Sequence, residues 1–271
     1  MSYIFRDASL GFSHSLDKNP SAESFDLHVH DKYEILCFVS GNAKYLVEGH
    51  EYTLTPGCIM LMRPAETHRL ALKGKSPYER YVLSFRAEDL RAIGEVEQLL
   101  RPFSERGLGE KNRYVAGELS GIDSLAFFKK MKEECEVLSP RTAIISNLAC
   151  LLGALNCAFL KKDSGEGEKV HSDAGTQMLS YINRNLCGDV SLESVSRHVH
   201  MSPSQVNRIF KKMTGTSVYD YIISKRFVMV QELIAGGEGV MAASQRCGFS
   251  DYSSFYRLYK KRTGHAPSKP H

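Results

Sequence analysis

Several features that mark other classes of protein are missing from this chain of 271 residues. It has no tryptophan. Its seven cysteines form no CxxC pair and no small-domain disulfide spacing, so we expect reduced thiols and a cytoplasmic location. The first residues, MSYIFRD, reach a charge within seven positions without an apolar core, so export is not expected. We find no GxxxxGK(S/T) phosphate loop and no assignable nucleophilic triad, which disfavours the enzymes built on them.

The composition is that of an ordinary globular protein. Hydrophobic residues make up 42% and charged residues 24% of the chain, which excludes overall disorder, and the length suggests two domains. One long stretch, 142–160, is uncharged. It contains Ser146, Asn147, Gly153 and Asn156, which a lipid-facing helix would rarely carry together. We therefore predict a helix that is buried or faces a protein partner, and no membrane span.

The N-terminal part, 1–162, is predicted to be one domain that begins with β-structure. Short strands separated by Gly and Pro turns indicate a β-sandwich or barrel over about 1–87. Helices are expected over about 88–162, at 88–100, 122–138 and 142–160. The expected strands are 33–39, 43–47, 52–54 and 58–62.

The C-terminal part, 173–271, is predicted to be a separate helical domain. The polar, glycine-containing segment before it indicates a linker at 163–172. Helical periodicity then continues to the end of the chain, interrupted only by Gly and Pro residues. A long helix over about 218–235 is expected in the middle of this domain.

A sequence pattern occurs twice in the helical domain. VNRIFKKMTG at 206–215 corresponds to FYRLYKKRTG at 255–264, with a constant offset of 49 residues. A short helix with a small residue, Ser196 or Ser244, precedes each copy. Each half therefore predicts a helix-turn-helix whose second helix has an apolar core face and a basic face.

The second helix of each half supplies the candidate DNA-binding residues. Arg reads base edges or grips phosphates, Lys supplies phosphate charge, and polar residues early on a recognition helix meet bases in the major groove. The candidates in the first copy are Ser204, Gln205, Asn207, Arg208, Lys211 and Lys212. Those in the second copy are Tyr252, Ser253, Ser254, Tyr256, Arg257 and Lys260.

The distribution of charge supports this interpretation. The whole chain carries only +4. From residue 173 onward there are 13 Lys and Arg against 7 Asp and Glu, whereas the preceding residues hold 22 against 24. The positive excess thus lies entirely in the helical domain, as expected for a protein that binds a polyanion.

Residues 189–267 resemble the AraC/XylS-type bacterial transcriptional regulators, most specifically in CGFSDYSSFYRLYKKRTGHAP at 247–267. The resemblance implies two helix-turn-helix units joined by a long helix, with their recognition helices in successive major grooves of double-stranded DNA. It also implies a structural role for Arg226, a homodimer and an N-terminal module that senses a small molecule. Departures from the usual family residues occur at Ser196, Ala243, Ser244, Tyr259 and Ala266, and all are compatible with packing.

The β-rich module contains a second set of candidate site residues. The spacing His28-x-His30-x3-Glu34-x6-Gly41 is similar to the first motif of the cupin barrel, and we expect His28 and His30 on one strand face, with His68 on a later strand. The second cupin motif is not matched. The expected fold is therefore α+β, a cupin-like barrel and helical dimerisation segment followed by an all-α double helix-turn-helix domain.

Three uses of this second set stay open. The first is a lining for a small organic effector such as a carbohydrate, with His28, His30, Glu34, Tyr45, His68 and Arg69 as effector-binding residues and Tyr33 and Tyr81 as further candidates. The second is a divalent transition metal on His28, His30, Glu34 and His68. The third is a purely structural set of histidines.

The sequence as a whole predicts a ligand-responsive, sequence-specific DNA-binding transcription regulator that is not an enzyme and requires no cofactor. Its expected partners are promoter DNA, a small-molecule effector, a second copy of the chain and, as a further candidate, RNA polymerase. The alternative is a metal-dependent cupin isomerase or dioxygenase with an appended DNA-binding domain. A third hypothesis is a DNA-binding protein whose β-module only supports assembly.

Overall fold

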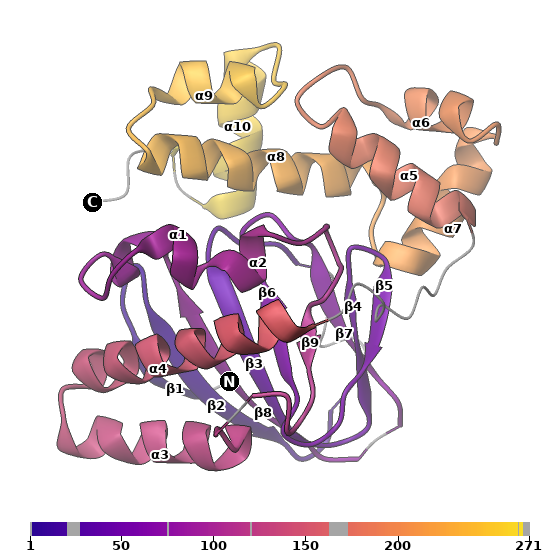
Figure 1. Ribbon diagram of the computed structural model, residues 1–271. Coiled ribbons are helices and arrows are strands. Elements are labelled where there is room, and N and C mark those ends of the chain that lie inside the picture. The colour runs from indigo at the N-terminus through magenta and orange to yellow at the C-terminus, as the bar shows by residue number, and fades with distance from the viewer. Residues whose placement is uncertain are drawn as a thin grey trace. The chain divides into compact units, whose positions relative to one another are not determined.

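The computed structural model describes residues 2–20, 28–74, 76–119, 121–162, 173–264 and 266–267 (Figure 1). Contacts divide the chain into two compact units. The first, called here the β-unit, comprises Met1–Asp26, Lys32–Arg63 and His68–Lys169. The second, the helical unit, comprises Val170–His271 with the short segments Leu27–Asp31 and Pro64–Thr67. The predicted linker at 163–172 lies outside the described residues.

The β-unit is built on two antiparallel sheets. One has the strand order β1-β2-β8-β3-β6-β9, and the other has the order β5-β4-β7. Hydrogen bonds between the described strands do not close the two sheets into one continuous barrel. The strands are β1 (Ser2–Arg6), β2 (Gly11–Asp17), β3 (Tyr33–Ser40), β4 (Ala43–Val47), β5 (His50–Thr53), β6 (Ile59–Met62), β7 (His68–Leu72), β8 (Tyr78–Phe85) and β9 (Arg113–Tyr114).

Strand alternation gives the β-unit two hydrophobic cores. Leu36 and Phe38 of β3 lie in an inner core together with residues of β4, β6 and β7. Their neighbours Ile35 and Cys37 lie in a larger core formed with the helices. Successive residues of a strand point to opposite faces, so β3, which is buried on both sides, is apolar along nearly its whole length.

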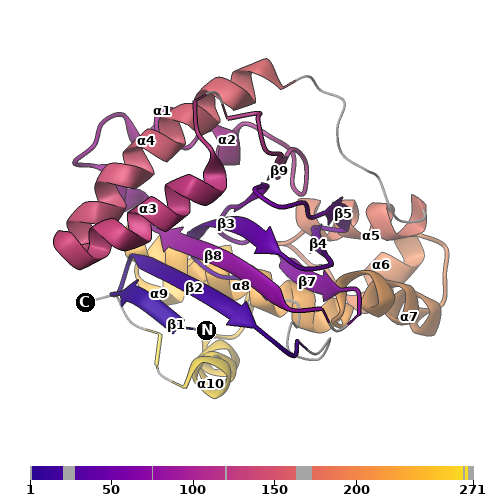
Figure 2. The same cartoon turned by 90° about the horizontal axis from the view of Figure 1, so that it is seen from below.

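Helices cover the outer core. They are the short η2 (Ala87–Leu90), α1 (Val96–Leu99) and α2 (Arg101–Ser104), followed by α3 (Ser124–Val137) and α4 (Pro140–Lys161). The views agree that α3 and α4 lie side by side (Figures 1 and 2). Asp123 caps α3, and Ser139 caps α4 with Pro140 in its first turn, so both helices begin where their polar caps place them.

Two predictions for this segment were wrong. A single helix was expected at 88–100, but the chain forms a 3₁₀ turn and a separate short helix, with Gly94 between them. Glycine has a low helix propensity, and here it follows the end of the 3₁₀ turn. Helices were expected over about 88–162 and no strand was predicted there, whereas β9 pairs with β6 and extends the larger sheet.

Helix α4 corresponds to the uncharged stretch of the sequence. By length and composition it would be able to cross a membrane, and half of its most apolar window is buried inside the protein. Ile144, Leu148 and Leu155 are fully buried in the outer core. Asn147 and Asn156 use their amides to bond carbonyl oxygens one turn earlier, which satisfies polar groups on a mostly buried helix.

The helical unit contains α5 (Asp173–Arg184), α6 (Leu192–His198), α7 (Pro203–Thr214), α8 (Val218–Ala235), α9 (Val240–Arg246) and α10 (Tyr252–Thr263). Its polar residues fix the helix ends. Ser202 and Asp251 cap α7 and α10, and Gly215 and Gly264 end them in the left-handed conformation. Helix α8 has α5–α7 at one end and α9–α10 at the other (Figure 1).

Candidate nucleic-acid interface and effector site

The two halves of the helical unit form equivalent helix-turn-helix units, α6–α7 and α9–α10. After the first helix of each pair, the chain turns through a left-handed residue, His200 in one unit and Gly248 in the other. The next backbone N–H then donates to the carbonyl of Ser196 or Ser244 at 3.1 Å in both units. The turns are therefore closed by the same bond, which confirms the duplication that the sequence predicted.

The small residues of the first helices are buried. Ser196 is 5% exposed and Ser244 is fully buried. Their hydroxyls donate to the carbonyls of Leu192 and Met241 in their own helices, at 2.7 and 2.8 Å. A serine is accommodated at these positions because its buried hydroxyl is satisfied without another partner. Ala243 is also fully buried and packs in the second core.

Helix α7 presents a cationic face opposite its core face. Val206 and Phe210 are fully buried. Arg208, Lys211 and Lys212 are exposed, and none of them makes a hydrogen bond or ion pair with another described residue. Ser204 is also exposed, in the first turn of the helix. The cations of this helix are thus available to a polyanion without first breaking an internal contact.

Two other predicted DNA-binding residues of α7 also have structural roles. Gln205 and Ser202 form a reciprocal capping box, in which the Gln205 side chain accepts from the Ser202 N–H at 3.1 Å. Asn207 is half-buried, and its Oδ1 accepts from the N–H of Val218 at 3.2 Å. The sequence prediction did not anticipate that these side chains hold the ends of helices.

Helix α10 presents the corresponding face. Ser253, Ser254, Arg257 and Lys260 are exposed, whereas Tyr252 and Tyr256 are half-buried. Arg257 folds back on its own helix and donates to the Ser253 carbonyl and the Ser254 hydroxyl, both at 3.4 Å. Hydrogen bonds from Ser254 hold the pKa of the capping Asp251 below its usual range, so this carboxylate stays charged at the helix N-terminus.

The cations of the two recognition helices correspond in sequence and in exposure. Arg208 and Arg257 are both exposed, and the pairs Lys211-Lys212 and Lys260-Lys261 are exposed in the last turns of their helices. Arginine provides a planar fork for base edges or phosphates, and lysine provides charge for phosphates. The arrangement is suited to two successive contacts with a nucleic-acid duplex.

A buried polar cluster lies inside the β-unit. Glu34, Tyr45 and His68, three of the predicted effector residues, are 8%, 3% and 0% exposed. The Glu34 Oε1 atom lies 3.9 Å from His68 Nε2, and the Tyr45 ring stacks on the imidazole with centroids 5.8 Å apart. Burial raises the pKa of Tyr45 far above its usual range, and the Glu34 carboxylate adds to this. Tyr45 therefore remains a neutral hydrogen-bond donor.

The sequence prediction missed further members of this cluster. Tyr78 and Arg80 of β8 share a strand face, and the Arg80 guanidinium lies 5.0 Å from the Tyr78 ring centroid. Burial raises the pKa of Tyr78 to about 12. Ser15 pairs with Arg80 across β2 and β8, and its buried hydroxyl has no hydrogen-bond partner among the described residues. Alternation with a period of two in the segment 78–85 could have predicted that Tyr78 and Arg80 share one face of a strand.

The remaining predicted residues are placed differently. His28 forms an isolated bridge residue and His30 lies in a loop, so the expectation that both lie on one strand with Glu34 was wrong. The chain bends at 31–32 before β3 begins. Arg69 follows His68 on β7 and therefore faces away from the cluster. Of the proposed metal ligands, Glu34 and His68 belong to the β-unit, and His28 and His30 belong to the helical unit.

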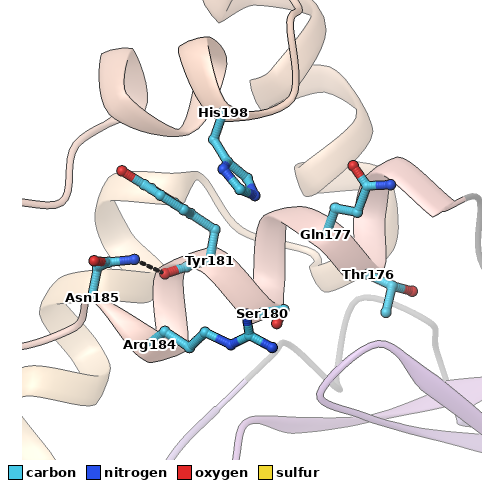
Figure 3. A pocket seen from close by; sticks show the side chains of 7 residues that line it. All are labelled: Thr176, Gln177, Ser180, Tyr181, Arg184, Asn185 and His198. Carbon is cyan, nitrogen blue, oxygen red and sulfur yellow. Dashed lines mark hydrogen bonds between the residues drawn. The ribbon is translucent and has the colours of Figure 1, made fainter.

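The helical unit also carries a pocket of about 470 Å³ between α5 and α6 (Figure 3). The Tyr181 ring stacks on His198 with centroids 4.3 Å apart, and the Asn185 amide donates to the Tyr181 carbonyl at 2.8 Å. Gln177, Ser180 and Arg184 complete its polar wall. None of its lining residues lies on a recognition helix.

Two cation-bearing recognition helices in one unit and a buried polar cluster in a separate unit define a DNA-binding regulator with a sensing domain. The chain belongs to the AraC-like family of transcription regulators. Residues 16–155 match the AraC-like ligand binding domain, and residues 195–269 match a helix-turn-helix domain. The family identification based on the duplicated motif is thereby confirmed, as is the prediction of a ligand-responsive, DNA-binding transcription regulator.

Similar proteins include curated transcriptional activators. The chain is 21% identical over 248 residues to the HTH-type transcriptional activator RhaR of Mannheimia succiniciproducens, covering 90% of this chain and 86% of RhaR. It is 22% identical over 258 residues to RhaS of Klebsiella pneumoniae, again covering 90% and 86%.

Similarities to solved structures are also found. ToxT from Vibrio cholerae is 12% identical, with a TM-score of 0.41, and the match covers 96% of this chain and 97% of ToxT. The DNA-binding domain of AdpA in complex with a target DNA is 22% identical, with a TM-score of 0.34, over 35% of this chain and 87% of that domain.

Proposed function

We propose that the chain binds promoter DNA through both recognition helices, and that a small molecule bound by the β-unit changes this binding. The observation that carries the proposal is the recurrence of exposed Arg and Lys residues on α7 and α10, opposite two buried cores. The solvated face of an ordinary helix would not be expected to repeat the same cations at a fixed offset on two similar scaffolds.

Footprinting tests the DNA-binding part directly. The full-length protein would first select binding sites from a random double-stranded DNA pool. Two protected major-groove segments about one helical turn, or 34–36 Å, apart are expected on the selected sites. A footprint confined to one groove would contradict the use of both helices. An Arg184→Ala variant, changed on the exposed face of α5 outside the recognition helices, is the matched control and should keep the footprint.

For the effector, we propose a small hydroxyl-bearing molecule such as a carbohydrate. The Glu34 carboxylate accepts hydrogen bonds, the neutral Tyr45 hydroxyl donates them, and His68 does either according to its tautomer. An apolar wall with a few convergent polar groups is typical of sites for small organic ligands. Leu36, Phe38 and Leu70, which share the inner core with Tyr45, provide that wall.

A divalent transition metal is the alternative occupant. Imidazole and carboxylate are suitable donors for Zn²⁺, Fe²⁺, Ni²⁺ or Mn²⁺, and His68 with Glu34 would supply one of each. Metal analysis of the purified protein tests this, with a His68→Ala variant as the comparison. Metal that is retained by the wild type in stoichiometric amount and lost in the variant would favour this alternative. No catalytic role is proposed, because the similar curated proteins are transcriptional activators.

We further propose a homodimer that forms through the exposed face of α4. Ser146, Cys150, Gly153 and Cys157 are exposed at helical spacing on this face, and Leu160 is 69% exposed. The face carries no charge between Thr142 and Leu160, and nothing lies within 4 Å of a Cβ atom added at Gly153. Small uncharged residues at helical spacing allow two helices to approach closely.

The dimer is tested by sedimentation of the wild type and a Gly153→Glu variant. The variant should be monomeric at concentrations where the wild type is dimeric, and it should keep its thermal stability because Gly153 is exposed and a Cβ atom there meets no other atom. A Lys129→Gln variant, which also lowers the net charge by one but on the exposed face of α3, is the charge-matched control. We place the regulator in the cytoplasm, where bacterial DNA lies, with RNA polymerase as a candidate partner.

A further inference from the structure

Arg226 lies where the two helix-turn-helix units meet. The units have separate hydrophobic cores, one around Val206 and Phe210 and the other around Phe255 and Tyr259. Both cores use residues of α8, and Arg226 is in the middle of this helix. Because neither core spans both units, contacts near the middle of α8 have a large part in fixing their relative orientation.

The Arg226 guanidinium bridges the two helix-turn-helix units through three backbone carbonyl oxygens. Its Nε donates to Leu186 at 2.8 Å and its Nη2 donates to Gly188 at 2.7 Å, in the loop that leads into α6. Its Nη1 donates to Gly248 at 2.8 Å, in the turn between α9 and α10. The residue is 8% exposed and has no carboxylate within ion-pair distance among the described residues. Its charge is therefore solvated by the backbone of both units.

This bridge requires both an arginine and a glycine. Arginine presents donors in a rigid planar fork, whereas a lysine ammonium cannot reach three carbonyls in that geometry. Gly248 has φ of +86°, and a Cβ atom there would lie 2.8 Å from Arg226 Cζ and 2.9 Å from the Cys187 carbonyl oxygen. The equivalent position in the first unit, His200, carries a full side chain.

We propose that Arg226 fixes the separation and rotation between the recognition helices α7 and α10, and that it thereby sets the base-pair spacing that the protein accepts between its two half-sites. The inference rests on the proposed function, because it requires both helices to bind DNA. One added base pair moves a half-site by roughly 3.4 Å and rotates it by about 35°. A rigid pair of units cannot follow that change without losing contacts.

The test measures binding of the full-length protein to its selected site and to derivatives with one or two base pairs added or removed between the half-sites. The wild type should lose at least about tenfold in affinity at each altered spacing. Arg226→Gln should bind all spacings within about threefold of one another, with its largest loss at the native spacing. Arg226→Lys should be intermediate, because it keeps the charge but not the fork.

An Arg262→Ala variant is the matched control. Arg262 also links α10 to α8, through Asp220 and through Ser224 at 3.1 Å, but it lies on the surface and does not contact the first unit's loop. It should keep the wild-type spacing preference. Equal relaxation in Arg262→Ala and Arg226→Gln would overturn a specific role for Arg226.

The remaining outcomes are separable. If Arg226→Gln loses its helical circular dichroism, Gly248→Ala disturbs the same bridge from the other side and is measured instead. If every folded variant of the bridge keeps the full spacing preference, the role proposed for Arg226 is wrong, but the proposed binding of DNA by both helices still stands. A wild type indifferent to spacing would contradict the proposed binding by both helices, and the inference with it.

Discussion

The side-chain oxygen of Asn207 accepts a hydrogen bond from the backbone N–H of Val218 at 3.2 Å. This bond joins the recognition helix α7 to the first turn of α8, where backbone N–H groups lack partners within the helix. Replacing Asn207 by Ala should therefore lower the free energy of unfolding of the helical unit by about 1 kcal/mol. Urea denaturation measures this. Ser204→Ala, at an exposed position of the same helix, should leave stability unchanged, and an equal loss in both variants would contradict the assignment.

Arg208 is expected to affect DNA binding without affecting folding. It is exposed and has no partner among the described residues, so its removal costs no internal contact. Arg208→Ala should weaken binding to a selected operator by about 1–3 kcal/mol if the guanidinium contacts a base edge. Titration by fluorescence anisotropy measures the affinity, and thermal unfolding provides the control. A variant with unchanged affinity would remove Arg208 from the interface.

Lys211 should contribute charge and little sequence preference. It lies in the last turn of α7, where an ammonium group would reach the phosphate backbone. Lys211→Ala should reduce the slope of log affinity against log salt by about 1 and weaken binding to all sequences alike. Titrations at several salt concentrations on specific and unrelated DNA measure both effects. Weakening confined to the specific sequence would show base contact instead.

Glu34 is expected to determine the response to the effector. Glu34→Gln keeps the shape of the side chain but removes the charge beside Tyr45 and His68. A screen of monosaccharides and polyols by thermal shift should identify a ligand that stabilises the wild type, and the variant should lose most of that shift. Lys44→Gln on β4, next to Tyr45 but on the other strand face, should retain it. An undiminished shift in Glu34→Gln would place the effector elsewhere.

The β-unit should lose one stabilising interaction in acid. Burial acts to raise the pKa of Asp7, but backbone hydrogen bonds from Leu10 and Ser9 and the Arg141 guanidinium outweigh it, so the pKa is lowered. A carboxylate whose folded pKa is lowered stabilises the fold above its unfolded pKa, and this contribution is lost as pH falls through the folded value. Because the side chain is 34% exposed, solvent screening limits the contribution to about 1 kcal/mol or less.

An Asp7→Asn variant tests this interaction. It should unfold at lower urea concentration than the wild type at pH 6, and the difference should shrink at pH 3, because below the usual Asp pKa of 3.8 the unfolded chain binds a proton that the folded carboxylate resists. The same difference at both pH values would show that Asp7 acts through its shape and not through its charge.

The sequence by itself determined the helix-turn-helix architecture of the C-terminal part. The repeat at an offset of 49 residues and the terminal glycines are local signals, so the two helix-turn-helix units, the long helix 218–235 between them and the cations of the second helices could be predicted. The strands from 33 to 62 followed from turns and alternation for the same reason.

Only the tertiary structure decided which side chains meet. It brought Tyr78 and Arg80 to the buried cluster, turned Arg69 away from it and left His28 and His30 outside the strand that carries Glu34. It also placed Asn207 within hydrogen-bonding distance of the first turn of α8, and it brought loops of both helix-turn-helix units into hydrogen bonds with Arg226. These relationships depend on the register of distant segments, and residue spacing within one segment carries no information about that register.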